Sequence, residues 1–322
     1  MTDVTRPLNF AITGVAGFVA PRHLNAIRDT GNRLVAAVDP HDAVGVLDRY
    51  SFDVRFFKEI ERFDRHLEKL RRASPDDRVD YVSICSPNYL HDAHIRLALR
   101  AGANVICEKP IVINPWNLDL LQELERESGR RISTVLQLRL HSAVGALRQA
   151  LASAGGRRHQ VTLTYITARG GWYDVSWKGS EERSGGIVMN IGIHFFDLLL
   201  WLFGGVRASE VHVRTATAAA GSLDLQHADV RWFLSTNMAD LPFAPAPGGR
   251  TTFRAITVDG EQVELSEGFG DLHTKVYEET LAGGGCGIHD ARPSVELTYQ
   301  IRHAPITNPQ AALRPQNAPM DA

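Results

Sequence analysis

Two short segments combine residue types that could take a proton from an alcohol while a hydride leaves its carbon. The first is Cys-Glu-Lys-Pro at residues 107–110, in which Lys109 directly follows an apolar, strand-like run. Ligands of parallel sheets sit at the carboxyl ends of strands, where an ammonium can hydrogen-bond a hydroxyl and favour the developing alkoxide. Without other signals, the same lysine would be a solvated residue before a turn-forming proline.

The second segment, residues 185–197, begins with two glycines and continues as an apolar helical pattern interrupted by polar residues. On one helix starting near Ile187, Asn190, His194 and Asp197 stand at positions i, i+4 and i+7 and therefore share a face. An imidazole titrates near neutral pH, so His194 could accept the hydroxyl proton. A single helical histidine is more often part of a core, but the polar stripe favours the wall of a cleft.

A glycine-containing turn connects the first apolar run, residues 8–13, to a helical pattern. Its Gly-x-x-Gly-x-x-Ala spacing at residues 14–20 is a weak signal alone, although backbone amides there could bind a pyrophosphate. A second apolar run, residues 34–38, ends in Asp39, where a carboxylate accepts hydrogen bonds from the adenosine ribose and repels a 2′-phosphate. The sequence therefore predicts a dinucleotide site that takes NAD rather than NADP.

Residues 1–140 alternate short apolar runs with amphipathic helical patterns. Near-continuous apolar strands separated by helices indicate a parallel sheet covered on both faces, so we predict an α/β, doubly wound Rossmann domain that binds NAD. The predicted strands are residues 8–13, 34–38, 79–85, 105–107 and 132–138, and the predicted helices are residues 19–29, 42–50, 59–72, 91–100 and 115–127.

Residues 141–303 show long alternating apolar and polar runs instead. Alternation indicates strands with one exposed face, so we predict an α+β domain with a large open, mostly antiparallel sheet. Residues 304–322, rich in Pro, Ala, Asn and Gln, are predicted to be a C-terminal arm. The expected strands are residues 160–167, 211–217, 229–236, 252–258 and 262–265, and the expected helices are residues 141–152, 187–202, 272–281 and 295–301.

The composition is that of an ordinary globular protein of 322 residues, with 44% hydrophobic and 22% charged residues. The 35 Lys and Arg nearly balance the 37 Asp and Glu, which gives no electrostatic reason to expect a nucleic acid or an anionic membrane as partner. The N-terminus lacks a signal-peptide pattern and the apolar residues 195–205 are too few for a membrane span, so we expect a cytoplasmic protein. The three cysteines and the histidines lack zinc spacing, and no metal is expected.

Taken together, the motifs resemble the Gfo/Idh/MocA oxidoreductases over nearly the whole chain. The resemblance rests on the order of the glycine turn with Pro-Arg-His at residues 21–23 behind it, then Asp39, Ser-Pro-Asn at residues 86–88, Glu-Lys-Pro, and Gly-x-His-x-x-Asp at residues 192–197. It implies an NAD-dependent dehydrogenase with Lys109 and His194 as catalytic residues, and an open sheet that supports a homodimer or homotetramer. The residues implied on the cofactor side are Gly14, Ala16, Gly17, Phe18, Val19, Asp39, Ser86, Pro87, Asn88, His91, Glu108, Lys109 and Gln137.

Within that family, residues 169–197 resemble the branch that oxidises the 3-hydroxyl of UDP-N-acetylglucosaminuronic acid for lipopolysaccharide O-antigen synthesis. This substrate carries a pyrophosphate and a carboxylate, so its site needs local cations. Many relatives have aspartate at position 190. Asparagine there leaves His194 less biased towards its charged form, so Lys109 could share the general-base role. The implied substrate-binding residues are Lys109, Arg169, Tyr173, Ser176, Trp177, Lys178, Asn190, His194, His273 and Tyr277.

Three further points stay open from the sequence. The reduced cofactor could be released, or reoxidised in place by a 2-keto acid such as 2-oxoglutarate. A relative acting on a free sugar or inositol is an alternative, although a neutral ring does not need the cations near residue 169. A non-catalytic NAD-dependent sensor or regulator on the same fold is a second alternative, which would have no need of both Lys109 and His194.

Overall fold

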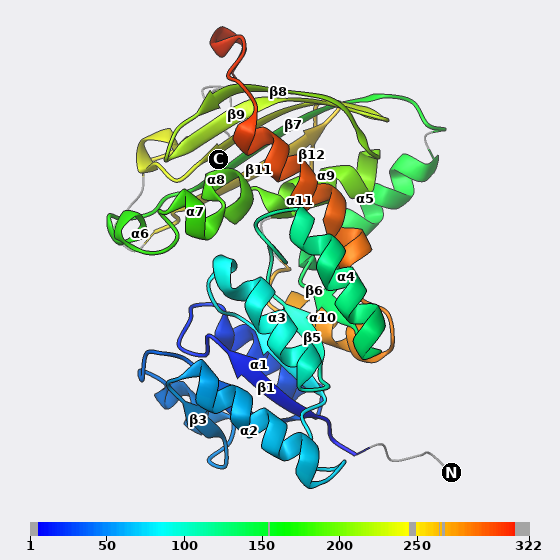
Figure 1. Cartoon of the computed structure of the whole chain (residues 1–322). Helices are drawn as coiled ribbons and strands as arrows, with labels where there is room; N and C mark the ends of the chain where they lie inside the picture. Colours follow the sequence, from blue (N-terminus) through cyan, green and yellow to red (C-terminus); the bar gives the residue numbers. More distant parts are fainter. Residues whose placement is uncertain (1–5, 154, 245–248, 264, 266–267, 313–322) are drawn as a thin grey trace. The chain divides into compact units, whose positions relative to one another are not determined.

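The computed structural model describes residues 6–153, 155–244, 249–263, 265 and 268–312 (Figure 1). The chain forms two compact units, the first made of residues 1–137 and 270–292 and the second of residues 138–269 and 293–322. This division departs from the predicted boundaries at 140 and 303. Helix α10 (Leu272–Leu281) returns to the first unit because it packs against α1 (Ala20–Asp29).

The first unit contains a six-stranded sheet in the order β3-β2-β1-β4-β5-β6, in which every pair of neighbours is parallel. The strand order reverses between β1 and β4, and ligands of doubly wound sheets bind beside such a reversal, at the carboxyl ends of the strands. This sheet confirms the predicted parallel α/β architecture. Its strands are β1 (Asn9–Thr13), β2 (Arg33–Val38), β3 (Arg55–Phe57), β4 (Tyr81–Ile84), β5 (Asn104–Cys107) and β6 (Ile132–Thr134).

The helices of the first unit agree with the predicted ones except between β2 and β3. There the expected helix at residues 42–50 is only a 3₁₀ turn, Gly45–Arg49, and the short strand β3 that follows was not predicted. Residues 132–138, expected to be one strand, form β6 and then a 3₁₀ turn at Gln137–Leu140. The remaining helices are α2 (Ile60–Ala73), α3 (His91–Arg100) and α4 (Trp116–Ser128).

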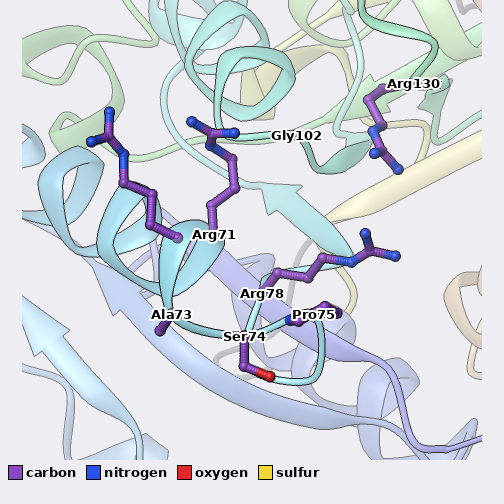
Figure 2. Close-up of a pocket in the computed structure, with 8 residues that line it drawn as sticks. Arg71, Ala73, Ser74, Pro75, Arg78, Gly102 and Arg130 are labelled. Atoms are coloured by element: carbon purple, nitrogen blue, oxygen red, sulfur yellow. The ribbon is translucent and has the colours of Figure 1, made fainter.

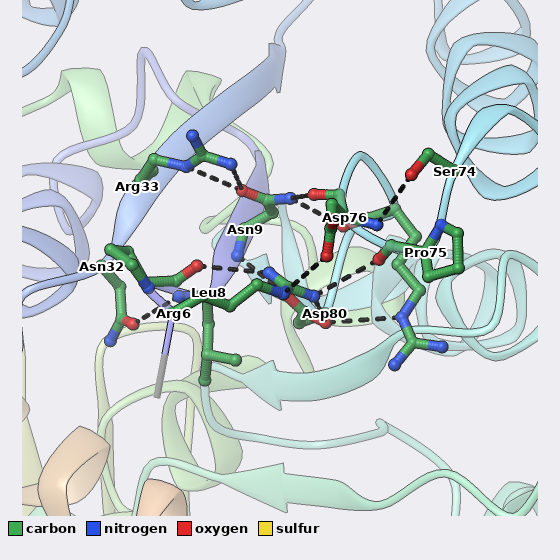
Figure 3. Close-up of polar contacts among 11 residues, drawn as sticks. Arg6, Leu8, Asn9, Asn32, Arg33, Ser74, Pro75, Asp76 and Asp80 are labelled. Carbon is green, nitrogen blue, oxygen red and sulfur yellow. Dashed lines mark hydrogen bonds and ion pairs between the residues drawn. The ribbon is translucent and has the colours of Figure 1, made fainter. Parts of the chain in front are cut away.

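A polar network holds the amino ends of the strands (Figure 3). Both Arg6 guanidinium nitrogens donate to the Asp80 carboxylate at 3.0 Å, and the amide of Asn9 donates to the same carboxylate at 2.9 Å. The Asn9 side chain in turn accepts from Arg33 and donates to the carbonyl of Asp76. These bonds anchor the start of β1 against the segment before β4.

The same amino-terminal edge carries a hollow lined by arginines (Figure 2). Arg71 and Arg72 at the end of α2 and Arg78 in the following loop precede β4, and Arg130 precedes β6. Glu68 pairs with Arg71 and Arg72 and so offsets part of this charge. Because ligands of such sheets bind at the carboxyl edge, this hollow lies at the opposite end from the predicted cofactor residues.

The second unit is built on a sheet in the order β12-β11-β7-β10-β9-β8, in which β7 and β10 are parallel and the other neighbours are antiparallel. The predicted open, mostly antiparallel sheet is therefore confirmed. The strand β9, rich in alanine, was not predicted. Gly221 in β9 leaves room for the Trp232 ring. A β-carbon at position 221 would lie only 2.7 Å from that ring. The strands are β7 (His159–Thr167), β8 (Val206–Arg214), β9 (Ala218–Leu225), β10 (Ala228–Ser235), β11 (Thr252–Val258) and β12 (Glu261–Val263).

One face of this sheet forms the main core of the second unit. Along β10, Val230, Trp232 and Leu234 point into that core, where Trp232 makes an edge-to-face contact with Phe196 of α9. Phe233 points to the other face and packs with Ile166 in a small apolar cluster. Successive side chains of β10 thus point to opposite faces of the sheet, as in any β-strand. The helices of this unit are α5 (Ser142–Ser153), α6 (Trp172–Val175), α7 (Glu181–Ser184), α8 (Gly186–Asn190) and α9 (Ile193–Phe203). Helix α11 (Ile288–His303) carries the chain out of the first unit.

The single helix predicted for residues 187–202 is wrong, because the chain breaks between α8 and α9. The helices 181–190 and 193–203 are bent by 46° at this break. Gly192 lies at this break, where there is no room for a side chain. A β-carbon there would lie 2.6 Å from Leu234 and would also meet the carbonyl oxygen of Val188. Asn190, His194 and Asp197 therefore do not share the face of one continuous helix.

No single helix in the part of the chain that the structure describes is long and apolar enough to cross a membrane.

The predicted C-terminal arm is described as far as residue 312, and residues 313–322 lie outside the described part. Its first residues run beside β8, where the amide of Thr307 donates to the carbonyl of Val211 at 2.7 Å. The Arg214 guanidinium donates to the carbonyl of Ala304 at 2.7 Å. This part of the arm is thus held against the sheet edge by one backbone hydrogen bond and one from an arginine side chain.

Candidate active site

The glycine turn after β1 has a geometry that only glycine can adopt at its first position. Gly14 has φ of +75°, and a β-carbon there would lie 2.5 Å from the amide nitrogen of Ser86. The amide of Gly17 donates to the carbonyl of Gly14 at 3.0 Å, which closes the turn before α1. The turn therefore lies directly against the end of β4, at the strand-order reversal, as a cradle for a pyrophosphate requires.

Asp39 ends β2 beside this turn, as predicted. One carboxylate oxygen accepts from the amide of Ala16 at 3.0 Å and the other accepts from the amide of His41 at 2.9 Å. The carboxylate is buried and held by backbone donors, so its position relative to the turn is set before any ligand arrives. Phe18, by contrast, is among the most exposed large apolar side chains of the described residues, at 86%.

The Ser-Pro-Asn segment after β4 is fixed by two histidines of α3. The ring of His91 lies between the carbonyl oxygens of Ser86 and Pro110, at 2.8 and 2.6 Å. His94 contacts the Ser86 hydroxyl at 2.9 Å, and burial lowers the pKa of His94 to about 4, so it is neutral near pH 7. His91 thereby ties the end of β4 to the Glu-Lys-Pro turn at the end of β5.

In that turn, Glu108 is buried and Lys109 is half-buried, with a cis peptide bond between Lys109 and Pro110. Burial alone would raise the pKa of Glu108, but hydrogen bonds from His23 and His273 hold this pKa well below its usual range. Glu108 is therefore an anion with protein partners.

Gln137 is also buried, and its side-chain oxygen has no hydrogen-bond partner among the described residues. A buried acceptor without a donor costs free energy, which a bound ligand with an amide group would recover.

Two residues predicted to contact substrate, His273 and Tyr277, lie on α10 in the first unit. Nε2 of His273 is 3.0 Å from the Glu108 carboxylate, and the Tyr277 hydroxyl is 2.8 Å from Nδ1 of His23. Both side chains are buried. His273 contacts Glu108 directly and Tyr277 does so through His23. The predicted contact of both residues with substrate stays a prediction.

The second unit brings together Tyr173 and Asn190, two more of the residues predicted to contact substrate. The Asn190 amide donates to the Tyr173 hydroxyl at 2.8 Å, and both residues are buried. His194 is half-buried in the first turn of α9. Asp197 does not extend this group, because its carboxylate forms a buried bidentate ion pair with Arg139 at 2.7 and 2.9 Å.

The Trp-rich segment forms a compact cationic group around Lys178. The ammonium lies 5.3 Å from the Trp172 ring centre and 5.6 Å from that of Trp177. Burial, and secondly the nearby Arg169, lower the pKa of Lys178. Neither cation makes an ion pair within the described residues. The Ser176 hydroxyl is used locally, since it donates to the carbonyl of Tyr173 at 2.8 Å.

Sequence reasoning missed His23, Ser83, His94 and Arg139, all of which hold a predicted site residue. The order Pro-Arg-His behind the glycine turn was the only signal for His23, and it carried no role. The other three gave no signal, because each contacts a residue from another element.

The fold and these motifs define an NAD-binding oxidoreductase, and the chain belongs to the Gfo/Idh/MocA oxidoreductase family. Residues 8–135 match its NAD-binding Rossmann fold and residues 156–237 match its C-terminal alpha/beta domain. The WlbA (WbpB) dehydrogenase of Thermus thermophilus, solved with NAD and alpha-ketoglutarate, is 50% identical with a TM-score of 0.90, over 94% of this chain and 97% of that chain. The same dehydrogenase, solved with NAD and UDP-GlcNAcA, is 49% identical with a TM-score of 0.89 over the same shares.

One further relative matches a smaller part of the chain. The putative UDP-kanosamine synthase oxidoreductase subunit of Amycolatopsis mediterranei is 34% identical over 138 residues, which are 41% of this chain and 37% of that protein. The match thus spans little more than a third of that protein's length. Family membership confirms the predicted NAD-binding Rossmann fold and dehydrogenase class.

Proposed function

We propose that this protein oxidises the 3-hydroxyl of UDP-N-acetylglucosaminuronic acid to a 3-keto sugar with NAD. The observation that carries the proposal is 49% identity, over nearly the full length of both chains, to a dehydrogenase whose structure holds NAD and UDP-GlcNAcA.

The cofactor-side residues fit NAD. Gly14 lets the turn pack against the backbone of Ser86, which a β-carbon would prevent, and the buried Gln137 oxygen offers an acceptor that lacks a donor within the described residues. When bound, NAD supplies the ring that accepts the hydride. We assign the ribose contact to Asp39, and assign the remaining contacts to the glycine turn and the Ser-Pro-Asn segment.

In the proposed mechanism, His194 accepts the proton of the 3-hydroxyl, and Lys109 hydrogen-bonds the same oxygen and favours its alkoxide character. The Tyr173 hydroxyl, which accepts from Asn190, is thereby oriented for a further polar contact with the sugar.

We assign binding of the substrate pyrophosphate and carboxylate to Arg169 and Lys178. Arg169 disfavours the charged form of Lys178, and neither cation has an acidic partner within the described residues. A carboxylate or pyrophosphate would relieve that repulsion and gain charge-assisted hydrogen bonds. A neutral sugar or inositol would not.

The direct test is absorbance of NADH after purified protein and NAD are mixed with each of three substrates. We expect turnover, or a 3-keto product, with UDP-N-acetylglucosaminuronic acid and not with UDP-N-acetylglucosamine or myo-inositol. Turnover of myo-inositol alone would replace the substrate assignment, and NAD binding without turnover of any substrate would favour a sensor.

The assay is run with and without 2-oxoglutarate. We propose that this 2-keto acid reoxidises NADH in place, since the Thermus relative was solved with alpha-ketoglutarate. In that case NADH absorbance appears only transiently while 3-keto sugar and 2-hydroxyglutarate accumulate. A cytoplasmic homotetramer acting in lipopolysaccharide O-antigen synthesis is the setting that we propose.

Cofactor choice gives a separate prediction. Replacing Asp39 by serine removes the carboxylate that a ribose needs and that a 2′-phosphate would meet. We expect the ratio of kcat/KM for NAD over NADP to fall about 10- to 100-fold, the effect of losing one charged hydrogen bond. An unchanged ratio, measured with both cofactors at saturating sugar, would remove Asp39 from cofactor recognition.

A further inference from the structure

A chain of buried side chains lies behind Glu108 in the first unit. It links Ser83 of β4, Tyr277 and His273 of α10, and His23 of α1 to one carboxylate. The Ser83 and Tyr277 hydroxyls are 2.6 Å apart, and Tyr277 is 2.8 Å from Nδ1 of His23. Nε2 of His23 and Nε2 of His273 lie 3.1 and 3.0 Å from the same Glu108 oxygen.

The hydrogen-bond directions in this chain follow from charge. Glu108 is ionised and can only accept, so both imidazoles donate from Nε2. Burial lowers the pKa of His23, so the ring is neutral and its Nδ1 must accept. The Tyr277 hydroxyl therefore donates to His23 and accepts from Ser83. The hydrogen bonds thus run in one direction, from Ser83 through Tyr277 and His23 to Glu108. They select the tautomer of His23 that carries its proton on Nε2.

Such a network costs free energy, because the Glu108 carboxylate and the four polar side chains linked to it are withdrawn from water. Packed apolar residues of the same volume would serve stability at least as well. The Glu108 anion has another use, because it directly precedes Lys109 in the chain. The backbone amide of Lys109 donates to the second Glu108 oxygen at 3.2 Å. His91 holds the following carbonyl, that of Pro110.

We propose that His23, His273 and Tyr277 are positioning residues for Lys109. They orient the Glu108 anion so that its second oxygen fixes the backbone amide of Lys109. The inference rests on the proposed role of Lys109 in catalysis, but not on the identity of the sugar.

The ring nitrogens and the carboxylate oxygen of His23, Glu108 and His273 lie within 4.8 Å of one another, a spacing that a metal ion could also use. The hydrogen-bond arrangement accounts for these contacts better. Both nitrogens lie at hydrogen-bond distance from one oxygen, and the tyrosine on the far nitrogen of His23 satisfies the donating tautomer. A metal would need the lone pairs of both imidazoles to point at a common centre.

The matched variants are Tyr277→Phe and Tyr81→Phe. Both tyrosines stack on Phe10, with ring centres 5.7 and 5.2 Å away, but the Tyr81 hydroxyl makes no hydrogen bond to the described residues. Loss of the Tyr277 hydroxyl frees His23 to change tautomer and turn away from Glu108. We expect kcat to fall about 10- to 100-fold, as small misplacements of catalytic groups do, with little change in the Kd of NAD. Tyr81→Phe should match the wild type.

A second pair of variants keeps the test valid if Tyr277→Phe folds poorly. His273→Gln retains an N–H at a position similar to Nε2, whereas His273→Leu retains none. The proposal expects kcat of His273→Gln to stay within a few-fold of the wild type and kcat of His273→Leu to fall like that of Tyr277→Phe. Equal losses in both His273 variants, or equal behaviour of the two tyrosine variants, would overturn it.

A readout without substrate separates this proposal from the proposed function. The rate at which an acylating reagent labels Lys109, followed by mass spectrometry of the peptide, reports the environment of the ammonium directly. We expect this rate to change several-fold in Tyr277→Phe and not in Tyr81→Phe, even if the uronic acid proves not to be the substrate. An unchanged rate in Tyr277→Phe, or a stoichiometric metal found by elemental analysis of the purified protein, would contradict the positioning role.

Discussion

Replacing Lys109 by methionine is expected to lower kcat about 10³-fold while NAD still binds. Methionine keeps most of the length and apolar volume of the side chain and removes only the ammonium. The loss follows because the 3-hydroxyl oxygen would no longer have a cationic donor as its proton leaves, and such proton-transfer groups contribute roughly 10²- to 10⁴-fold. Single-turnover formation of NADH measures the step, and titration of NAD by fluorescence measures binding.

Lys69→Met is the matched control, because Lys69 is an exposed lysine on α2 of the same unit. It should leave both quantities unchanged. If Lys109→Met retained more than a tenth of the wild-type rate, Lys109 would have no role in the chemical step. If it lost NAD binding as well, its role would be to hold the cofactor.

Asp197→Asn is expected to lower the free energy of unfolding by about 3 kcal/mol. The Asp197 carboxylate is almost fully buried and accepts from Nε and Nη2 of Arg139, whose guanidinium also lies 5.8 Å from the Trp201 ring centre. Neutralising Asp197 removes the buried carboxylate that pairs with Arg139, and breaking a buried ion pair in this way costs about 3–5 kcal/mol. Urea unfolding followed by fluorescence measures the change.

Two controls define this prediction. In the double variant Asp197→Asn with Arg139→Met, no unpaired charge remains, so its loss should be smaller than the sum of the two single losses. The exposed pair Arg28 and Asp29 serves as a surface reference, where Asp29→Asn should cost less than about 1 kcal/mol. A loss below about 1 kcal/mol for Asp197→Asn would show that the pair is as weak as a surface pair.

Local patterns were sufficient to predict most of the fold. The parallel strands read as apolar runs because both of their faces are buried, and the strands of the second unit read as alternating runs because their faces differ. Patterns failed where packing overrides local preference. The alanine-rich strand β9 forms because Gly221 admits the Trp232 ring, and the helix after residue 186 breaks because Gly192 is packed against Leu234.

The candidate site divides in the same way. Asp39, Gly14 and Lys109 could be predicted because each stands at the end of a strand, and a strand end has a known place in a parallel sheet. Asp197 could not be placed correctly, because its role depends on Arg139, a residue 58 positions away.

The sequence by itself determined the class of fold and the NAD cofactor, and it indicated Lys109 as a candidate, because strand ends and glycine turns are local signals. Only the tertiary structure decided what surrounds Glu108. His23 and Tyr277 are separated by 254 positions, and they meet because α10 returns to the first unit and packs on α1. A hydrogen-bond network of this kind is specified by where elements pack, and no spacing along the chain encodes it.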